Sequence, residues 1–383
     1  MCRQSASVCL AKTPVGQRDT SMGLVERLRL LPDPRCRRGR RHSFVSVLLI
    51  AASAALAGAK SYTAIGQWAA SAPQHTLARL GTRAVGALGI RIAPSTATIR
   101  RVVATVCPGG LAELTGCNPA SQDTLAVDGK SARGSRSSDG PAAHLLAAMT
   151  GAGQTVAQLR VPDRTNEITC FAALLSPFDL TGVVVTADAL HTQRAHARFL
   201  VEEKKAHYLL VVKANQPALF QLLRCMPWPQ VAARHYQRGQ GHGRRETRVV
   251  RVLTITDLDL DFPHAVQAAK ITRYRTDLKT GKLTRQTVYA ITDLPHRQAS
   301  PQRIGDLARS QWGIENRLHF VRDTAFREDA SKIRTGHGPE NMAALRNLAI
   351  NTLREHGHRN IAAGLRHVSY DPFTRPLDLL DIP

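Results

Sequence analysis

The sequence predicts an α/β protein in which a mixed sheet with helices packed on it follows an all-helical N-terminal domain. Three observations carry this prediction. The apolar pattern is helical from Gly23 to about Gly116, it changes to β-type runs at Thr124, and strands and helices then alternate as far as Lys213. With 383 residues, 43% of them hydrophobic, the chain is long enough to bury the cores of two or three domains.

The N-terminal part divides into a polar segment and a helical domain. Residues 1–22 lack any periodicity, so we expect a flexible tail, and residues 23–120 are assigned to the helical domain. The apolar stretch from Phe44 to Ala59 is too short to span a membrane and is predicted to be a buried helix. Ser61 and Ser95 are each placed to cap a following helix. We therefore expect no association with a membrane.

The core is assigned to residues 121–356. In chain order its predicted elements are a buried strand over Thr124–Asp128, a hairpin of His144–Thr150 and Gln154–Val161, a helix from Thr165 or Asn166 to about Leu175, a buried strand over Gly182–Asp188, a helix over His191–Lys204 and a strand over His207–Lys213. This order of elements is typical of a mixed sheet with helices packed on it.

A β-rich insertion is predicted between about residues 227 and 301, where the helical pattern disappears. Its β-branched runs, separated by turns, are Thr247–Thr256, Ala268–Tyr274 and Gln286–Ile291. Helices return from Ile304 onward. The last segment, residues 357–383, is interpreted as a C-terminal tail.

The charge balance points to a polyanionic partner. Lys and Arg total 52 against 29 Asp and Glu, a formal net charge of +23. Seven arginines fall between Arg27 and Arg41, a run typical of a phosphate-binding edge, although a generally basic surface is the alternative. Arg100 and Arg101 lie on the helix that Ser95 caps and could enter a DNA groove, or simply cover an ordinary helical surface.

The cysteines indicate an intracellular protein. Seven are scattered along the chain without a Cys-x-x-Cys pair, so we interpret them as reduced thiols in a cytosolic protein.

Three acidic residues are candidates for chemistry. Asp128 and Asp188 each end a predicted strand, although a turn and a helix cap are the alternatives. Glu315 lies on the predicted helix from Ile304 to Phe326, about 100° from the apolar stripe of that helix. Its alternative is an ordinary solvated glutamate. Four further acids compete with Glu315 for the third place: Asp323, Glu328, Asp329 and Glu340.

Several sequence blocks resemble the DDE insertion-sequence transposases, and among them the branch related to the H-repeat-associated proteins. These blocks are Ala126–Lys130, Val185–Gln193, Tyr208–Gln216, Gln311–His319, Phe326–Asp329, Gly336–Asn341 and Leu345–Asn347. The resemblance runs in order from about Leu24 to Leu380.

The resemblance implies a ribonuclease-H-like core in which Asp128, Asp188 and Glu315 are the catalytic, metal-binding acids, with a β-strand insertion between the second and third. Some relatives carry a tyrosine and an arginine seven and four residues before the glutamate and a lysine seven residues after it. Here those positions are Ala308, Gln311 and Arg322. Arg322 can keep the charge of the lysine, and the nearby Arg309 can replace the arginine.

The implied activity is metal-dependent cleavage at the ends of an insertion sequence and strand transfer into target DNA. Two Mg²⁺ or Mn²⁺ ions about 4 Å apart, held by carboxylates, suit this reaction. We expect double-stranded DNA, both terminal repeats and target, as the partner, a homo-oligomer on DNA, and a cytoplasmic, nucleoid-associated location. The alternatives are a non-catalytic DNA-binding protein derived from a transposase and a plain metal-dependent nuclease.

Basic and amide side chains in or beside these blocks are candidates for DNA-backbone contacts, with plain solubility as the alternative for each. The candidates are Lys130, Arg133, Lys213, Asn215, Arg309, Arg322 and Arg334. Because Arg322 is predicted to share the helix face of Glu315, Arg322→Ala is expected to weaken cleavage and to leave folding intact.

Overall fold

The computed structural model describes residues 22–383 except 37–39, 121, 139, 242 and 256–259. The predicted tail over residues 1–22 therefore lies outside the described residues, apart from Met22. The chain forms two compact units. We call Met1–Asn118, Gly129–Asn166 and Glu315–Pro383 the helical unit, and Pro119–Asp128 with Glu167–Ile314 the sheet unit.

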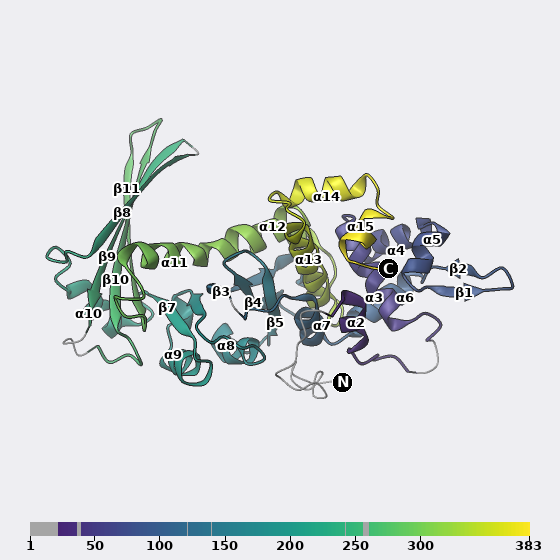
Figure 1. Cartoon of the computed structure of the whole chain (residues 1–383), viewed down its shortest axis with the longest axis horizontal. Coiled ribbons are helices and arrows are strands. Elements are labelled where there is room, and N and C mark those ends of the chain that lie inside the picture. The colour runs from purple at the N-terminus through teal and green to yellow at the C-terminus, as the bar shows by residue number, and fades with distance from the viewer. Residues whose placement is uncertain (1–21, 37–39, 121, 139, 242, 256–259) are drawn as a thin grey trace. The chain divides into compact units, whose positions relative to one another are not determined.

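The helical unit combines N-terminal and C-terminal helices with a hairpin (Figure 1). Its N-terminal helices are α2 (Leu24–Arg29), α3 (Phe44–Leu56), α4 (Tyr62–Ser71), α5 (Gln74–Arg79), α6 (Thr96–Thr105) and α7 (Pro108–Thr115). Its strands are β1 (Arg83–Val85), β2 (Ile90–Ile92), β4 (Ala143–Thr150), β5 (Thr155–Val161) and the end of β3 (Thr124–Ala132), which is followed by the 3₁₀ turn η1 (Arg133–Ser135). Its C-terminal elements are η4 (Glu315–His319), α12 (Phe320–Thr324), η5 (Glu328–Ala330), α13 (Gly338–Glu355), α14 (Ile361–Ser369) and α15 (Arg375–Leu379).

The predicted buried helix of the N-terminal domain is confirmed as α3. Ser43 caps it, and all but one of its residues are buried. The two predicted caps are also present, since the Ser61 hydroxyl accepts from Ala64 N at 3.2 Å and the Ser95 hydroxyl accepts from Thr98 N at 3.3 Å. Among the described residues, none of the helices is both long and apolar enough to cross a bilayer.

The C-terminal segment is not a tail, so this prediction is wrong. Residues 357–383 contain α14 and α15, and Leu377 and Ile382 are almost fully buried. Trp68 Nε1 donates to Pro372 O at 2.9 Å, which fastens the segment to α4. Helices this short carry too few turns for their apolar periodicity to stand out in the sequence.

Helix α13 packs against α3, α6, α7 and β5. Asn351 links α13 to β5. Its side-chain amide accepts from Thr155 N at 2.8 Å and donates to Thr155 O at 2.9 Å, the same pair of hydrogen bonds that a neighbouring strand would make. The N-terminal and C-terminal helices of this unit therefore share one core.

The sheet unit holds most of a nine-stranded sheet. Its strands are the start of β3, β6 (Val184–Ala187), β7 (His207–Val212), β8 (Arg234–Gly241), β9 (Arg244–Thr254), β10 (Gln267–Asp277) and β11 (Leu283–Thr292). Its helices and turns are α8 (Glu167–Leu175), η2 (Ala189–His191), α9 (Arg194–Arg198), η3 (Phe199–Glu203), α10 (Pro217–Cys225) and α11 (Pro301–Ile314).

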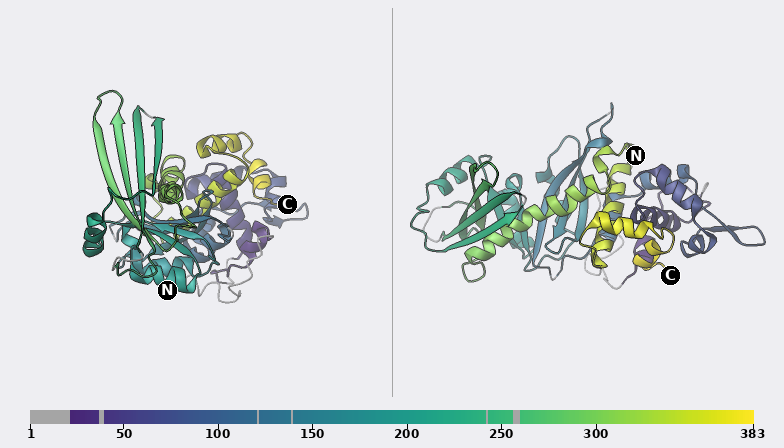
Figure 2. Two further views of the ribbon diagram at one scale, coloured as in Figure 1. Left: turned by 60° about the vertical axis from the view of Figure 1, so that its left-hand side comes forward. Right: turned by 90° about the horizontal axis from the view of Figure 1, so that it is seen from above.

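The strand order is β5-β4-β3-β6-β7-β11-β10-β9-β8. The β3–β6 and β6–β7 pairs are parallel, and the pairs from β7–β11 to β9–β8 are antiparallel. The predicted mixed sheet and the hairpin of β4 and β5 are thus confirmed. The predicted β-rich insertion continues this sheet, because β11 pairs with β7 over Tyr289–Thr292. Figure 2 shows β8–β11 side by side.

Helix α11 packs against β8, β9 and β10 (Figures 1 and 2). Ile304 and Leu307 of the helix join Val250 and Ile271 of the strands in one buried cluster. Helix α11 also contacts β7 and β6, the strand that ends just before Asp188.

Four of the cysteines, Cys36, Cys117, Cys170 and Cys225, are free. Cys107 is disulfide-bonded, so the prediction of a reduced thiol is wrong at that position.

Candidate active site

Asp128 and Asp188 lie at matching ends of two paired strands. In the parallel β3–β6 ladder the last pair is Val127 with Ala187, and an aspartate follows each of these residues. Both aspartates are half-buried. The Asp188 side chain caps η2, because its Oδ1 accepts from Leu190 N at 2.9 Å. The structure therefore brings two of the three predicted acids to neighbouring strands.

A buried amide from α11 ties these two strand ends together. Gln311 Nε2 donates to Val127 O at 2.9 Å, and its Oε1 accepts from the Thr186 hydroxyl at 2.8 Å. Gln311 is thus bound one residue before Asp128 and two residues before Asp188. Sequence reasoning noted Gln311 only as a departure from the arginine of some relatives and missed this role. An amide fits here because it both donates and accepts.

Side chains from the segment after β7 hold the loop that follows Asp188. Asn215 Nδ2 donates to Ala189 O at 2.7 Å, and Gln216 Nε2 donates to Thr192 O at 2.8 Å. Asn215, predicted to contact DNA, therefore has an internal bond in this structure, while Lys213 is exposed. The Tyr208–Gln216 block supports the position of Asp188.

Glu315 begins a π-helical turn. Helix α11 ends at Ile314, the π turn η4 follows, and α12 continues from Phe320. Glu315 is exposed and belongs to the helical unit, whereas Asp128 and Asp188 belong to the sheet unit. Within the described part of the chain, no group of three or more His, Cys, Asp or Glu side chains is placed to hold a metal ion. The π turn is notable because such turns are frequent at functional sites.

The π turn also overturns the prediction for Arg322. An uninterrupted α-helix would place Arg322 on the face of Glu315, but a π turn holds one more residue and rotates the following residues by about 100°. Arg322 is 0% exposed as a result. It offers no nitrogen to a DNA phosphate in this structure, so its assignment as a backbone contact is wrong.

Arg322 instead belongs to a buried ion cluster around Glu328. Arg322 Nε and Nη2 donate to the Glu328 carboxylate at 2.9 and 2.6 Å, and Arg346 Nη1 donates to it at 2.8 Å. Burial alone would raise the pKa of Glu328, but the charges of Arg322 and Arg346 outweigh it and lower the pKa to about 2. Arg322 Nη1 also donates to Gln158 of β5 at 3.0 Å.

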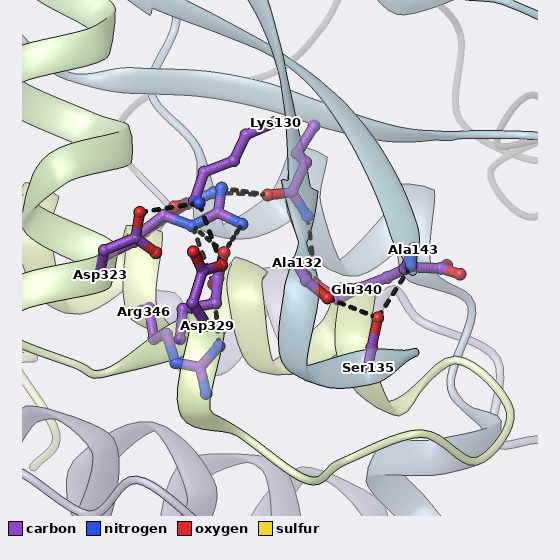
Figure 3. Close-up of polar contacts among 12 residues, drawn as sticks. Lys130, Ala132, Ser135, Ala143, Asp323, Asp329, Glu340 and Arg346 are labelled. Carbon is purple, nitrogen blue, oxygen red and sulfur yellow. Dashed lines mark hydrogen bonds and ion pairs between the residues drawn. The ribbon is translucent and has the colours of Figure 1, made fainter. Parts of the chain in front are cut away.

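Lys130 is also occupied by internal carboxylates. Its Nζ lies 2.8 Å from Asp323 Oδ2 and 3.3 Å from Asp329 Oδ1, and its side chain is only 10% exposed. Figure 3 shows these acids converging on the lysine. Arg133 is different, because its side chain is 82% exposed and its Nε lies 3.7 Å from Asp329 Oδ2, a longer contact than those of Lys130.

The four acids that compete with Glu315 all have cationic partners. Asp323 and Asp329 pair with Lys130, Glu328 pairs with two arginines, and the buried Glu340 accepts from Arg160 Nη1 at 2.9 Å. Sequence spacing alone could not separate them from Glu315.

The remaining basic candidates are exposed. Arg309 lies on α11, and Arg334 donates from Nε to Gly134 O at 3.3 Å. In the N-terminal arginine run, Arg37 and Arg38 lie outside the described residues, whereas Arg35 is bound to Asp33 at 2.9 Å and Arg27 to Gly116 O at 3.4 Å. Part of that run therefore has structural partners.

Comparison with protein families identifies the chain. Residues 119–352 match the family model described as the transposase DDE domain, and residues 25–117 match a model described as DDE_Tnp_1-associated. The chain belongs to the DDE transposase family.

Curated relatives agree with this assignment. The chain is 27% identical to the putative protein YbfL of Escherichia coli K12 and 26% identical to the H repeat-associated putative transposase YhhI of the same strain. Each alignment covers 90% of this chain and 93% of the relative. It is also 29% identical to the putative transposase YncI of E. coli O157:H7, over 61% of this chain and 62% of the relative. The resemblance seen in the sequence blocks is therefore confirmed.

Among solved structures, a piggyBac transposase synaptic complex with hairpin DNA aligns with 88% of this chain and 72% of its own chain, at 11% identity and a TM-score of 0.40.

The family blocks divide into two groups in this DDE transposase chain. Blocks around Asp128 and Asp188 place carboxylates at strand ends beside neutral amides. The block around Glu328 places a carboxylate in a buried cluster of arginines. In the first arrangement the half-buried Asp188 accepts a hydrogen bond from a backbone N–H, whereas in the second Glu328 accepts hydrogen bonds from two arginines.

Proposed function

We propose that this protein is a transposase that cleaves DNA at the ends of an insertion sequence and joins the freed strands to target DNA, with metal ions bound to Asp128, Asp188 and Glu315. The observation that carries the proposal is the register of β3 and β6, which sets Asp128 and Asp188 side by side. Carboxylates at the carboxyl ends of adjacent parallel strands are a common place for a site in an α/β sheet. A ribonuclease-H-like core is part of this proposal.

The chemistry of the donor set suits divalent cations. Mg²⁺ and Mn²⁺ prefer oxygen ligands, and the half-buried Asp128 and Asp188 and the exposed Glu315 would supply them. When bound, two such ions supply activation of the attacking oxygen and stabilisation of the leaving oxygen.

The chain's own contribution is to orient the acids. Leu190 N donates a hydrogen bond to Asp188 Oδ1, which orients the carboxylate. Asp188 Oδ2 takes no part in that hydrogen bond. Gln311 binds the backbone or side chain of both strands just before the acids, so neither strand end can shift without breaking a buried hydrogen bond. Ligands held in this way need little reorganisation when the reaction begins.

The partner in this proposal is double-stranded DNA. The net charge of +23 favours a polyanion, and the exposed Arg133, Lys213, Arg309 and Arg334 remain proposed backbone contacts. Strand transfer at paired element ends would be carried out by a homo-oligomer.

A cleavage assay with a matched pair of variants tests the proposal. The substrate is a labelled duplex carrying the element's terminal repeat, incubated with Mg²⁺ or with EDTA. Asp188→Asn is compared with Asp179→Asn, because the exposed Asp179 likewise accepts from the backbone N–H two residues on, at 3.0 Å from Thr181 N. We expect metal-dependent nicking at the repeat boundary that Asp188→Asn loses and Asp179→Asn keeps.

Two other results would count against the proposal. Tight binding of the repeat by the unaltered protein without cleavage in Mg²⁺ or Mn²⁺ would favour a non-catalytic DNA-binding protein. Equal loss of cleavage in both variants would remove Asp188 from the metal site and point to a general effect on folding.

A further inference from the structure

Strands β8–β11 carry two chemically different faces. Side chains alternate between the faces of a sheet, so residues paired across strands share a face. Val250 and Ile271 are paired and pack against α11, which defines the α11 face. We call the opposite side the arginine face. Apart from the apolar Leu253, Ala268 and Ile291, its side chains are these sixteen: Arg234, Tyr236, Arg238 and Gln240 of β8, Arg245, Thr247, Val249 and Arg251 of β9, Lys270, Thr272, Tyr274 and Thr276 of β10, and Leu283, Arg285, Thr287 and Tyr289 of β11.

Charge is separated between these faces. Six of the sixteen side chains on the arginine face are cationic, and none of the sixteen is acidic. The acids of these strands, Glu246 and Asp277, project on the α11 face. There Glu246 forms ion pairs with Arg248 and Arg273, each at 2.5 Å, and with Arg275 at 3.3 Å. The cations of the arginine face thus have no carboxylate of these four strands beside them on the same face.

Three of these cations lie directly beside one another. Arg234 pairs with Arg251, and Arg251 pairs with Lys270. Neighbouring strands are about 4.8 Å apart, and like charges directly opposite each other destabilise a sheet. Burial, followed by the charges of Arg285 and Arg251, lowers the pKa of Lys270. A bound polyanion would relieve this repulsion.

Tyrosines lie between the arginines. The Arg234 guanidinium lies 5.8 Å from the Tyr236 ring centre, and that of Arg285 lies 5.9 Å from the Tyr274 ring centre. Tyr236 is 48% exposed. Stacking on a ring restricts a guanidinium and leaves its edge N–H groups available for phosphate oxygens.

Val249, Thr272 and Tyr289 of this face are buried. We propose that its exposed part, with Arg234, Arg238, Arg245 and Arg285, is a DNA-binding surface that holds the phosphate backbone of duplex DNA without reading its sequence. The inference rests on the proposed function in taking DNA as the polyanion. Three inter-strand spacings of about 4.8 Å make the four strands about 14 Å wide. This exceeds the roughly 12 Å width of the major groove, which admits a two-stranded ribbon at most. Contacts from this face therefore fall on phosphates.

Two double variants with equal charge loss test the inference. Arg238→Ala/Arg285→Ala removes two exposed cations from the arginine face. Arg244→Ala/Arg275→Ala removes two cations from the α11 face of the same strands. Binding of a fluorescent duplex of arbitrary sequence is measured by anisotropy between 50 and 200 mM salt. Both variants are made in the Asp188→Asn protein in EDTA, so no cleavage intervenes. Thermal melting by circular dichroism checks that each variant folds.

Each lost phosphate contact lowers the slope of log K against log[salt] by about 0.9. We expect the arginine-face variant to lose about 1.8 from the slope, so its affinity deficit is about tenfold larger at 50 mM than at 200 mM salt. The α11-face variant should keep the slope of the parent. A second duplex of unrelated sequence should give the same result.

Equal slopes for two folded double variants would overturn the inference while leaving the proposed function intact. A slope loss confined to the terminal-repeat sequence would overturn the claim that sequence is not read. If the parent protein binds no duplex even at 50 mM salt, the proposed function itself fails.

Discussion

Asp188 of the sheet unit and Glu328 of the helical unit both lie in sequence blocks that resemble transposases, yet their surroundings are opposite. Asp188 is half-buried and is held by a backbone N–H, in a loop fastened by the amides of Asn215 and Gln216. Glu328 is 1% exposed and receives hydrogen bonds from two buried arginines.

The difference separates a carboxylate suited to chemistry from one that serves the fold. Neutral donors orient a carboxylate and leave its charge available to a cation. Two arginines use that charge internally, and breaking such a buried cluster leaves an uncompensated charge in the core. Four predictions, from the largest expected effect to the smallest, test this comparison.

Asp128→Asn should lose cleavage and keep its stability, whereas Glu328→Gln should lose stability and keep cleavage. Loss of groups that merely support metal ligands costs about 10–100-fold in activity, so loss of a direct ligand at Asp128 should cost about 1000-fold or more. The free energy of unfolding of Asp128→Asn should change by less than about 1 kcal/mol. Glu328→Gln should unfold more easily, and its folded fraction should cleave at the normal rate. Single-turnover cleavage and urea denaturation measure both, and a similar stability loss in both variants would contradict the comparison.

Arg322→Ala should lower the free energy of unfolding by about 3–5 kcal/mol, because Glu328 would remain buried with one arginine fewer. The matched control is Arg133→Ala, which removes an arginine with an 82% exposed side chain and should stay within about 0.5 kcal/mol of the parent. Urea denaturation provides the measurement. A loss below 1 kcal/mol for Arg322→Ala would mean that the cluster contributes little to the fold.

Gln311→Ala should lower cleavage by about 10–100-fold, on the scale of losing support behind a metal ligand. It should also cost about 1–3 kcal/mol of stability, because the Thr186 hydroxyl and the Val127 carbonyl lose their partner. Gln302→Ala, at an exposed position on the same helix, is the control. Unchanged cleavage in Gln311→Ala would show that the strand ends hold the acids without this amide.

Acid should destabilise the helical unit through Glu328. Its folded-state pKa of about 2 lies below the ordinary value of 4.5, so its contribution is complete above pH 4.5 and is lost as pH falls toward 2. The stability of the parent should therefore fall toward that of Glu328→Gln over this range, by at most about 1.4 kcal/mol per pH unit. Denaturation at several pH values checks this, and a constant difference between the two proteins would contradict it.

The strands of the core could be predicted because each carries its own signal. Runs such as Thr124–Asp128 and Gly182–Asp188 are continuously β-branched or apolar and end on an acid. The structure has strands at Thr124–Ala132 and Val184–Ala187. Strand β8 was not predicted, because Arg234, Tyr236 and Arg238 alternate with polar residues and bury no apolar face of their own.

Long-range pairing could not be predicted. The β-rich insertion became part of the main sheet through the pairing of β11 with β7, and no local pattern identifies a partner strand about 80 residues away in this chain. The same holds for the last segment, in which Pro372 and Asp378 bind Trp68 and Arg79 of the N-terminal helices.

The sequence by itself determined the family, the positions of the two strand-end aspartates and the basic character of the protein. The tertiary structure decided which charges are available. Lys130 and Arg322 look like phosphate contacts in the sequence, but Lys130 pairs with Asp323 and Asp329, and Arg322 pairs with Glu328. The physical reason is that a charge is neutralised or left free by neighbours within a few ångströms in space, and the π turn at Glu315 changes which neighbours the residues after it meet.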